Sequence, residues 1–193
     1  QYLNIEDTLE GIGCLSQKSL IVTDYGMFFA DKNGAYMHDG QSPRKISNGI
    51  QQGIETESFG NIDNIRNLTW DNVVNNRYAK PPYVTFNAAT NSVLYIVEYV
   101  DSKSFDSNSL DKNTVVKSYI WSYNVHQQRW DLWELDKDST IGKPTIGTDN
   151  KVYIPMNGGI YEVQGGSHKK PYTWLSKKIN MEEDSIFKVF NKV

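Results

Sequence analysis

The sequence has almost no cysteine, because Cys14 is the single one among 193 residues. One thiol cannot form an internal disulfide bond, and it lacks the second thiolate that cysteine-based zinc modules use. The composition therefore excludes the disulfide-rich secreted scaffold and the cysteine-based zinc module.

Long apolar runs and an excess of positive charge are also missing. No apolar run approaches the ~18 residues of a membrane span, and the first residues do not resemble a signal peptide, so we expect no membrane partner. Lys and Arg number 20 against 23 Asp and Glu, for a net charge of −3. A polycationic nucleic-acid binder is therefore excluded for the chain as a whole. The start at Gln1 rather than at Met predicts a piece of a longer protein.

Aromatic residues are abundant, at 12% of the chain. Together with Val and Ile they fall into short runs bounded by Gly, Asn, Asp and Pro, which is typical of strands separated by tight turns. Met27–Ala30 and Ala35–His38, joined by Asp31-Lys32-Asn33-Gly34, have the pattern of a hairpin. We therefore predict a mainly all-β fold.

An internal repeat relates the two ends of the chain. A shift of 125 residues places Thr23-Asp24 on Thr148-Asp149, Gly34 on Gly159 and Tyr36 on Tyr161. A third set of strand-like segments lies between the two copies. The sequence thus predicts three four-stranded antiparallel units, at about 15–47, 83–135 and 144–178, with an insertion at 48–82.

The expected strands of the first unit are Leu20–Thr23, Met27–Ala30, Ala35–His38 and Arg44–Ile46. Those of the second are Tyr83–Asn87, Ser92–Val100, Val115–Asn124 and Arg129–Leu135. Those of the third are Pro144–Gly147, Lys151–Ile154, Gly159–Val163 and Tyr172–Lys177. The insertion holds the two helical candidates, Gly49–Phe59 and Asp63–Asn75, where apolar residues recur every three to four positions.

Three four-stranded meanders in series are what stacked blades of a β-propeller need. Because propellers close with four to eight blades, we predict a β-propeller-like fragment of a larger propeller. The alternating segment Ile186–Val193 predicts one more strand.

Several stretches resemble a known family of bacteriophage proteins. The matching segments are Gly11-Ile12-Gly13-Cys14, Lys18–Val22, Gly26–Ala30, Asn33–Tyr36, Asp39-Gly40, Arg44–Ser47 and Tyr172–Lys178. In this pattern the chain resembles the propeller region of tailed-phage neck and tail proteins, of the packaged-DNA stabilisation (hub) or tail nozzle and tubular type. The motif consists of turns and strands rather than a catalytic signature.

The resemblance implies a non-enzymatic structural protein of the virion. In that family several copies form a ring or tube through which DNA is retained and ejected. The implied partners are a homo-oligomer ring, neighbouring portal or tail proteins and, transiently and without sequence specificity, phage DNA. The implied location is the phage tail or neck, after assembly in the host cytoplasm.

Residues with catalytic or metal-binding chemistry are sparse. The histidines, His38, His126 and His168, lie in or beside turns of different units without metal-ligand spacing, so we predict hydrogen-bonded turn residues. Gly165-Gly166-Ser167-His168 does not fit a nucleophile elbow. Asp31–Gly34 resembles the start of a calcium loop, but the remaining ligands are missing, which favours a hairpin turn. We expect no catalytic, cofactor-binding or metal-binding residue and no cofactor.

Two alternatives remain open at the level of the sequence. Asp24 and Asp149 are equivalent under the repeat and are candidates for the carboxylate pair of a glycan-binding or glycan-cleaving propeller, although each more simply caps a turn. The second alternative is a scaffold propeller that binds other proteins.

Two groups of side chains bear on partners. Lys169-Lys170 and Lys177-Lys178 are solvated lysines or phosphate contacts. Core packing is the leading interpretation for Trp121, Trp130, Trp133 and Trp174, followed by an oligomer interface.

Overall fold

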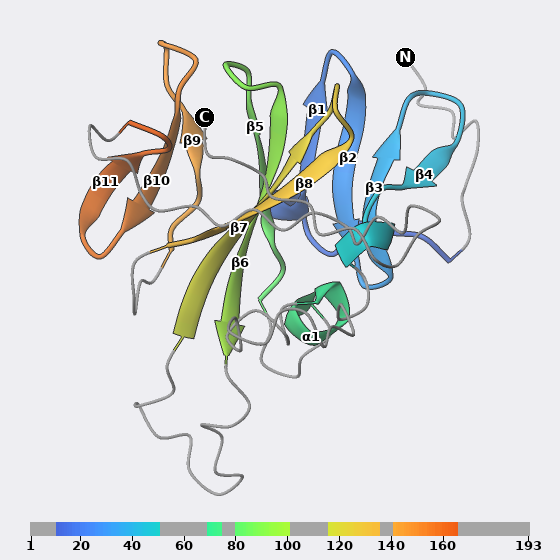
Figure 1. Cartoon of the computed structure of the whole chain (residues 1–193), viewed down its shortest axis with the longest axis horizontal. Coiled ribbons are helices and arrows are strands. Elements are labelled where there is room, and N and C mark those ends of the chain that lie inside the picture. Colours follow the sequence, from blue (N-terminus) through green and yellow to red (C-terminus); the bar gives the residue numbers. More distant parts are fainter. Residues whose placement is uncertain (1–10, 51–68, 75–79, 101–115, 136–140, 166–193) are drawn as a thin grey trace, which may run out of the picture.

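The chain forms three antiparallel β-sheets that stand side by side (Figure 1). The computed structural model describes residues 11–50, 69–74, 80–100, 116–135 and 141–165. Within these ranges every sheet follows the chain order, so each one is a meander. The mainly β fold that the sequence predicts is confirmed, although the described strands do not close into a ring.

We name the sheets A, B and C in chain order. Sheet A consists of β1 (Leu20–Thr23), β2 (Gly26–Asp31), β3 (Gly34–His38) and β4 (Pro43–Lys45). Sheet B consists of β5 (Tyr83–Asn87), β6 (Ser92–Val100), β7 (Val116–Asn124) and β8 (Arg129–Glu134). Sheet C consists of β9 (Thr145–Ile146), β10 (Val152–Met156) and β11 (Gly159–Glu162).

The strands of sheets A and B match the predicted ones to within one residue at each end. Sheet C differs more. The predicted strand Pro144–Gly147 is one residue too long at each end, because proline has no N–H to donate and Gly147 belongs to the following turn, where its N–H donates to Lys151 O at 2.9 Å. The predicted fourth strand, Tyr172–Lys177, and the segment Ile186–Val193 lie outside the described residues.

The predicted end of the second strand of sheet C, at Ile154, is wrong by two residues, since β10 continues to Met156. β9 pairs only with Val152 and Tyr153 of β10. Pro155 lies beyond this pairing, so its missing backbone N–H does not interrupt the ladder with β9. Its carbonyl oxygen still accepts a hydrogen bond from Gly142 N at 2.8 Å.

Helical structure in the insertion is short where it is described. The 3-10 helix η2 (Asn48–Ile50) overlaps the start of the predicted Gly49–Phe59, and α1 (Trp70–Val74) forms the end of the predicted Asp63–Asn75. The rest of both candidates lies outside the described residues. A further 3-10 helix, η1 (Gln17–Ser19), precedes β1 and was not expected from the sequence.

The internal repeat corresponds to a hairpin shared by sheets A and C. β2 and β3 pair through Asp31 and Gly34, and β10 and β11 pair through Met156 and Gly159. Both turns therefore contain two residues, and they lie at equivalent sequence positions under the shift of 125 residues. The hairpin interpretation of Asp31–Gly34 is confirmed.

The first core lies between sheets A and B. Its aromatic centre is the stack of Trp70 on Trp121, with ring centroids 5.6 Å apart, and Tyr95 meets Trp70 edge to face. The buried members are Phe28, Ala30, Ala35, Trp70, Val73, Val84, Val93, Tyr95, Val97, Tyr119, Trp121 and Tyr123. Side chains alternate along a strand, so the odd-numbered residues of β6 and β7 face sheet A.

The second core lies between sheets B and C and is aliphatic. The even-numbered residues of the same two strands face sheet C. Its buried members are Leu94, Ile96, Ile120, Ile141, Val152 and Ile154. Sheet B is thus covered on both faces, which explains why Val93–Val97 is an unbroken apolar run.

Candidate functional site

The most extensive polar arrangement in the described chain lies at one end of sheets A and B, where consecutive turns meet. These are the β1–β2 turn with Tyr25, the β5–β6 turn Ala88–Asn91 and the β7–β8 turn Val125–Gln128. Meander connections alternate between the two ends of a sheet, so these turns share the end drawn at the top of Figure 1. We call this arrangement the turn cluster.

The two turns of sheet B are built alike. Each has four residues between paired positions, and each follows an asparagine whose Oδ1 accepts a backbone hydrogen bond. Asn87 accepts from Ala89 N at 3.1 Å, and Asn124 accepts from Gln127 N at 2.8 Å. The last turn residue, Asn91 or Gln128, has φ of 50°. Asparagine favours such turns because its side chain bonds to the backbone a few residues ahead.

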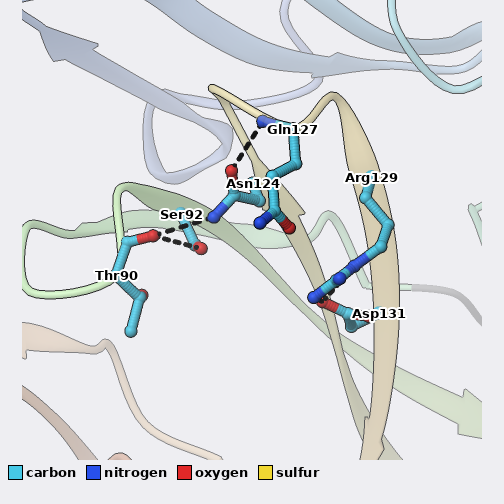
Figure 2. A network of polar contacts seen from close by, with 6 residues as sticks. All are labelled: Thr90, Ser92, Asn124, Gln127, Arg129 and Asp131. Atoms are coloured by element: carbon cyan, nitrogen blue, oxygen red, sulfur yellow. Dashed lines mark hydrogen bonds and ion pairs between the residues drawn. The ribbon is translucent and has the colours of Figure 1, made fainter.

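Direct hydrogen bonds join the two turns to each other. Figure 2 shows Asn124 reaching the neighbouring turn, where its Nδ2 donates to Thr90 O at 3.0 Å, an oxygen that also accepts from Ser92 Oγ at 3.1 Å. Val125 N donates to Asn91 O at 3.0 Å. The two turns of sheet B therefore form one hydrogen-bonded unit.

Tyr25 connects this unit to sheet A. Its hydroxyl lies 3.0 Å from Asn91 Oδ1 and 3.0 Å from His126 Nε2. Its ring packs against Phe86 and meets the His126 ring edge to face at 5.2 Å. Three turns that are far apart in the sequence thus converge on one hydroxyl group.

The nearby ion pair between Arg129 and Asp131 lies on β8 (Figure 2). Arg129 Nη2 is 3.0 Å from Asp131 Oδ2, and both side chains are exposed to solvent. Exposed pairs of this kind contribute little to stability, so the pair belongs to the surface around the cluster rather than to its framework.

The candidate carboxylates Asp24 and Asp149 do not come together. Asp24 is exposed in the β1–β2 turn, where Thr23 does the capping: its Oγ1 accepts from Tyr25 N at 3.1 Å. The prediction that Asp24 caps this turn is therefore wrong. Sheet B lies between the two aspartates, and packed sheets are ~10 Å apart, so two such spacings exceed the 5–9.5 Å of a glycosidase pair.

Asp149 has the predicted turn role. Its Oδ1 accepts from Lys151 N at 3.2 Å, and its Oδ2 accepts from the Tyr153 hydroxyl at 2.8 Å. The Tyr153 bond and then the Lys151 amide hold the pKa of Asp149 below its usual value. The same bond raises the pKa of Tyr153. A carboxylate held ionised in this way is suited to capping rather than to proton donation.

The other titratable candidates also make hydrogen bonds in turns. His38 Nδ1 accepts from Gly40 N at 3.0 Å, and His126 belongs to the turn cluster. Asp31 uses both oxygens on backbone groups, accepting from Asn33 N at 2.7 Å and from Gly13 N at 3.0 Å. In the part of the chain that the structure describes, no group of three metal-ligating side chains occurs.

Some candidates lie outside the described residues. These are Ser167, His168, Lys169, Lys170, Trp174, Lys177 and Lys178. Core packing is confirmed for Trp121, which is buried, and for Trp130 and Trp133, which pack against the two cores.

Among the helices described, none is long and apolar enough to cross a membrane.

Sequence reasoning missed Tyr25, Asn91 and Trp70. Trp70 contacts both sheets, because its ring stacks on Trp121 of sheet B and its Nε1 donates to Asp31 O of sheet A at 3.0 Å. The paired asparagines before the two turns of sheet B were the available signal for a turn cluster. Comparison of the chain with protein-family models, curated proteins and solved structures gives no match.

Proposed function

We propose that this chain is a non-enzymatic structural protein of a phage neck or tail, and that its three sheets are blades of a β-propeller. The observation that supports this most is the arrangement of equivalent strands. The first strands of the sheets are neighbours, with β1 against β5 and β5 against β9. At the other edge of sheets A and B, Trp130 Nε1 of β8 donates to Ile46 O, just after β4, at 2.8 Å. Blades around a common axis have this arrangement.

The glycines of the motif that resembles phage proteins are required by the backbone of sheet A. Gly26, Gly34 and Gly40 all have positive φ. A Cβ on Gly26 would lie 2.6 Å from His38 O, closer than any side chain allows. These glycines therefore maintain the tight turns of the blade.

The repeat also supports a stack that continues beyond sheets A and C. Under the shift of 125, Ala35 corresponds to Ile160. Ala35 is buried against sheet B, whereas Ile160 lies on the face of sheet C that points away from sheet B and is 75% exposed. At the opposite end of the stack, Val22 is 68% exposed on the outer face of sheet A. These are the faces that further blades or further copies would cover in the proposed ring.

Localisation in the virion tests the function. In particles of a phage that encodes this chain, mass spectrometry should detect the protein, and immunogold labelling should place it at the neck or tail. Its absence from purified particles would contradict the proposal. Glycan cleavage by the protein that is lost in Asp24→Asn or Asp149→Asn would instead establish the glycosidase alternative.

Analytical ultracentrifugation tests the assembly separately. The full-length protein should form a ring of several copies or bind a purified portal complex. Ile160→Asp should weaken that association, because a charge would be buried at the contact. Gln127→Asp is the matched control, since Gln127 is exposed at the turn end, away from both outer faces. A full-length protein that stays monomeric with and without the portal complex would contradict the ring.

A further inference from the structure

We infer that Tyr25, Asn91 and His126 form a hydrogen-bonded latch that closes the turn end of the A–B interface, and that His126 carries a hydrogen on Nε2 to make it. The inference does not depend on the proposed function. It follows from the number of hydrogens and lone pairs at one hydroxyl group.

The hydrogen count at Tyr25 decides the direction of each bond. A tyrosine hydroxyl has one hydrogen to donate and two lone pairs that accept. Tyr25 donates to Asn91 Oδ1, which has only lone pairs to offer. The contact with His126 Nε2 at 3.0 Å must then use a hydrogen on that nitrogen, with Tyr25 Oη as the acceptor.

Only some forms of the imidazole satisfy this arrangement. The neutral tautomer with the hydrogen on Nε2 fits, and so does the doubly protonated ring, because both donate from Nε2. The neutral tautomer with the hydrogen on Nδ1 would place two acceptors against each other. The latch therefore fixes the neutral tautomer and survives protonation of the ring.

The place of the latch gives it a mechanical role. The backbone carbonyl of Asn91 accepts a hydrogen bond from Val125 N, which joins the two turns of sheet B to each other. The Tyr25 hydroxyl holds the side chains of both turns at once. Opening of this end, which separates the β1–β2 turn from sheet B, must break both bonds of the hydroxyl. The latch thus joins the two sheets at their turn end.

Nuclear magnetic resonance of the imidazole nitrogens tests the assignment directly. In alkaline buffer, where free imidazole is neutral, the wild-type His126 should show a single tautomer protonated on Nε2. In Tyr25→Phe the acceptor is lost, and the signal should shift toward a mixture. An Nδ1-protonated ring in the wild type, or an unchanged tautomer in Tyr25→Phe, would overturn the inference.

Hydrogen exchange at the Val125 amide tests the mechanical role. His126→Leu should speed this exchange about fivefold, the effect expected for one neutral hydrogen bond. Tyr25→Phe removes both bonds of the hydroxyl and should speed it more, and the double variant should add little beyond Tyr25→Phe. His126→Gln, which restores an amide donor, should recover much of the protection. His38→Leu is the matched control, because His38 caps another turn of sheet A. Additive effects of the two single variants, or an equal effect of the control, would overturn the latch.

Discussion

Sheet B is joined to its two neighbours in different ways. The A–B interface is aromatic and hydrogen-bonded: its core has twelve buried residues, including the stacked Trp70 and Trp121. Two indole N–H groups donate to backbone carbonyls of sheet A or of the residue after it. The B–C interface has six buried residues, all aliphatic. Among the described residues, a polar contact at this interface is the 3.3 Å bond from Ile141 N to Glu98 Oε1.

The difference separates two contributions to a stack of sheets. Apolar burial stabilises both interfaces in proportion to area, but it is non-directional. The indole N–H donors make the A–B interface directional, because each of them needs an acceptor at one position. We therefore expect sheets A and B to behave as one cooperative unit and sheet C to open from it more readily.

The largest effect should come from the aromatic core. Trp121→Ala removes a fully buried indole that stacks on Trp70, and loss of such a side chain costs about 3–5 kcal/mol. Urea unfolding followed by circular dichroism should show this loss over the whole cooperative transition. A loss restricted to sheet C, or one below about 1 kcal/mol, would contradict the account of the A–B unit.

The next effect should be local. Ile154→Ala empties a buried position between sheets B and C, at a cost of about 2–4 kcal/mol to the docking of sheet C. Hydrogen exchange should show lost protection in β10 and β11 but retained protection in β6. If β2 and β6 lost protection equally, the two interfaces would be one cooperative unit and the comparison would fail.

The directional part of the A–B interface can be tested at Trp130. Trp130→Phe keeps an aromatic ring but leaves Ile46 O without its indole donor, so we expect a loss of about 1 kcal/mol. Trp133→Phe is the matched control, because Trp133 packs on the opposite face of β8 against the aliphatic core. Equal losses in the two variants would show that the hydrogen bond adds nothing beyond packing.

The smallest effect concerns the Tyr95 hydroxyl, which is fully buried and has no hydrogen-bond partner within the described structure. Tyr95→Phe should leave stability unchanged or raise it by less than about 1 kcal/mol. Destabilisation by more than that amount would show that the hydroxyl has a partner.

The same hydroxyl predicts a dependence on alkaline pH. Burial raises the pKa of Tyr95 well above its usual value of 10.0. The unfolded chain releases this proton near pH 10 and the folded chain does not, so the stability that the neutral phenol provides is present below pH 10 and is lost as pH rises above it. Wild-type stability should fall more steeply above pH 10 than that of Tyr95→Phe. Parallel curves would contradict the burial of an unpaired phenol.

The sequence predicts local strand structure well and contacts between distant segments poorly. The strands of sheets A and B follow from alternation and turn residues, and the repeat predicts the hairpin shared with sheet C. Alternation in Val93–Val97 cannot say which face meets which sheet, because both faces are apolar. The convergence of Tyr25, Asn91 and His126 depends on how the sheets pack, and no local pattern encodes it.

The role of Asp24 shows the same limit at the level of one turn. Aspartate and threonine both cap turns, and the sequence favours the more common capping residue. In the structure Thr23 takes that position, since its hydroxyl also donates to Gly26 O at 3.0 Å. A carboxylate cannot make this second bond as a donor, because it has no hydrogen when ionised.

Hydrogen exchange of the wild-type protein, followed by mass spectrometry under native conditions, tests the central comparison most directly. The difference between the two interfaces predicts that the amides of β10 and β11 exchange through a partial opening, while those of β2, β6 and β7 exchange more slowly and together. Exchange of all three sheets at one common rate, or exchange of sheet A before sheet C, would contradict the account.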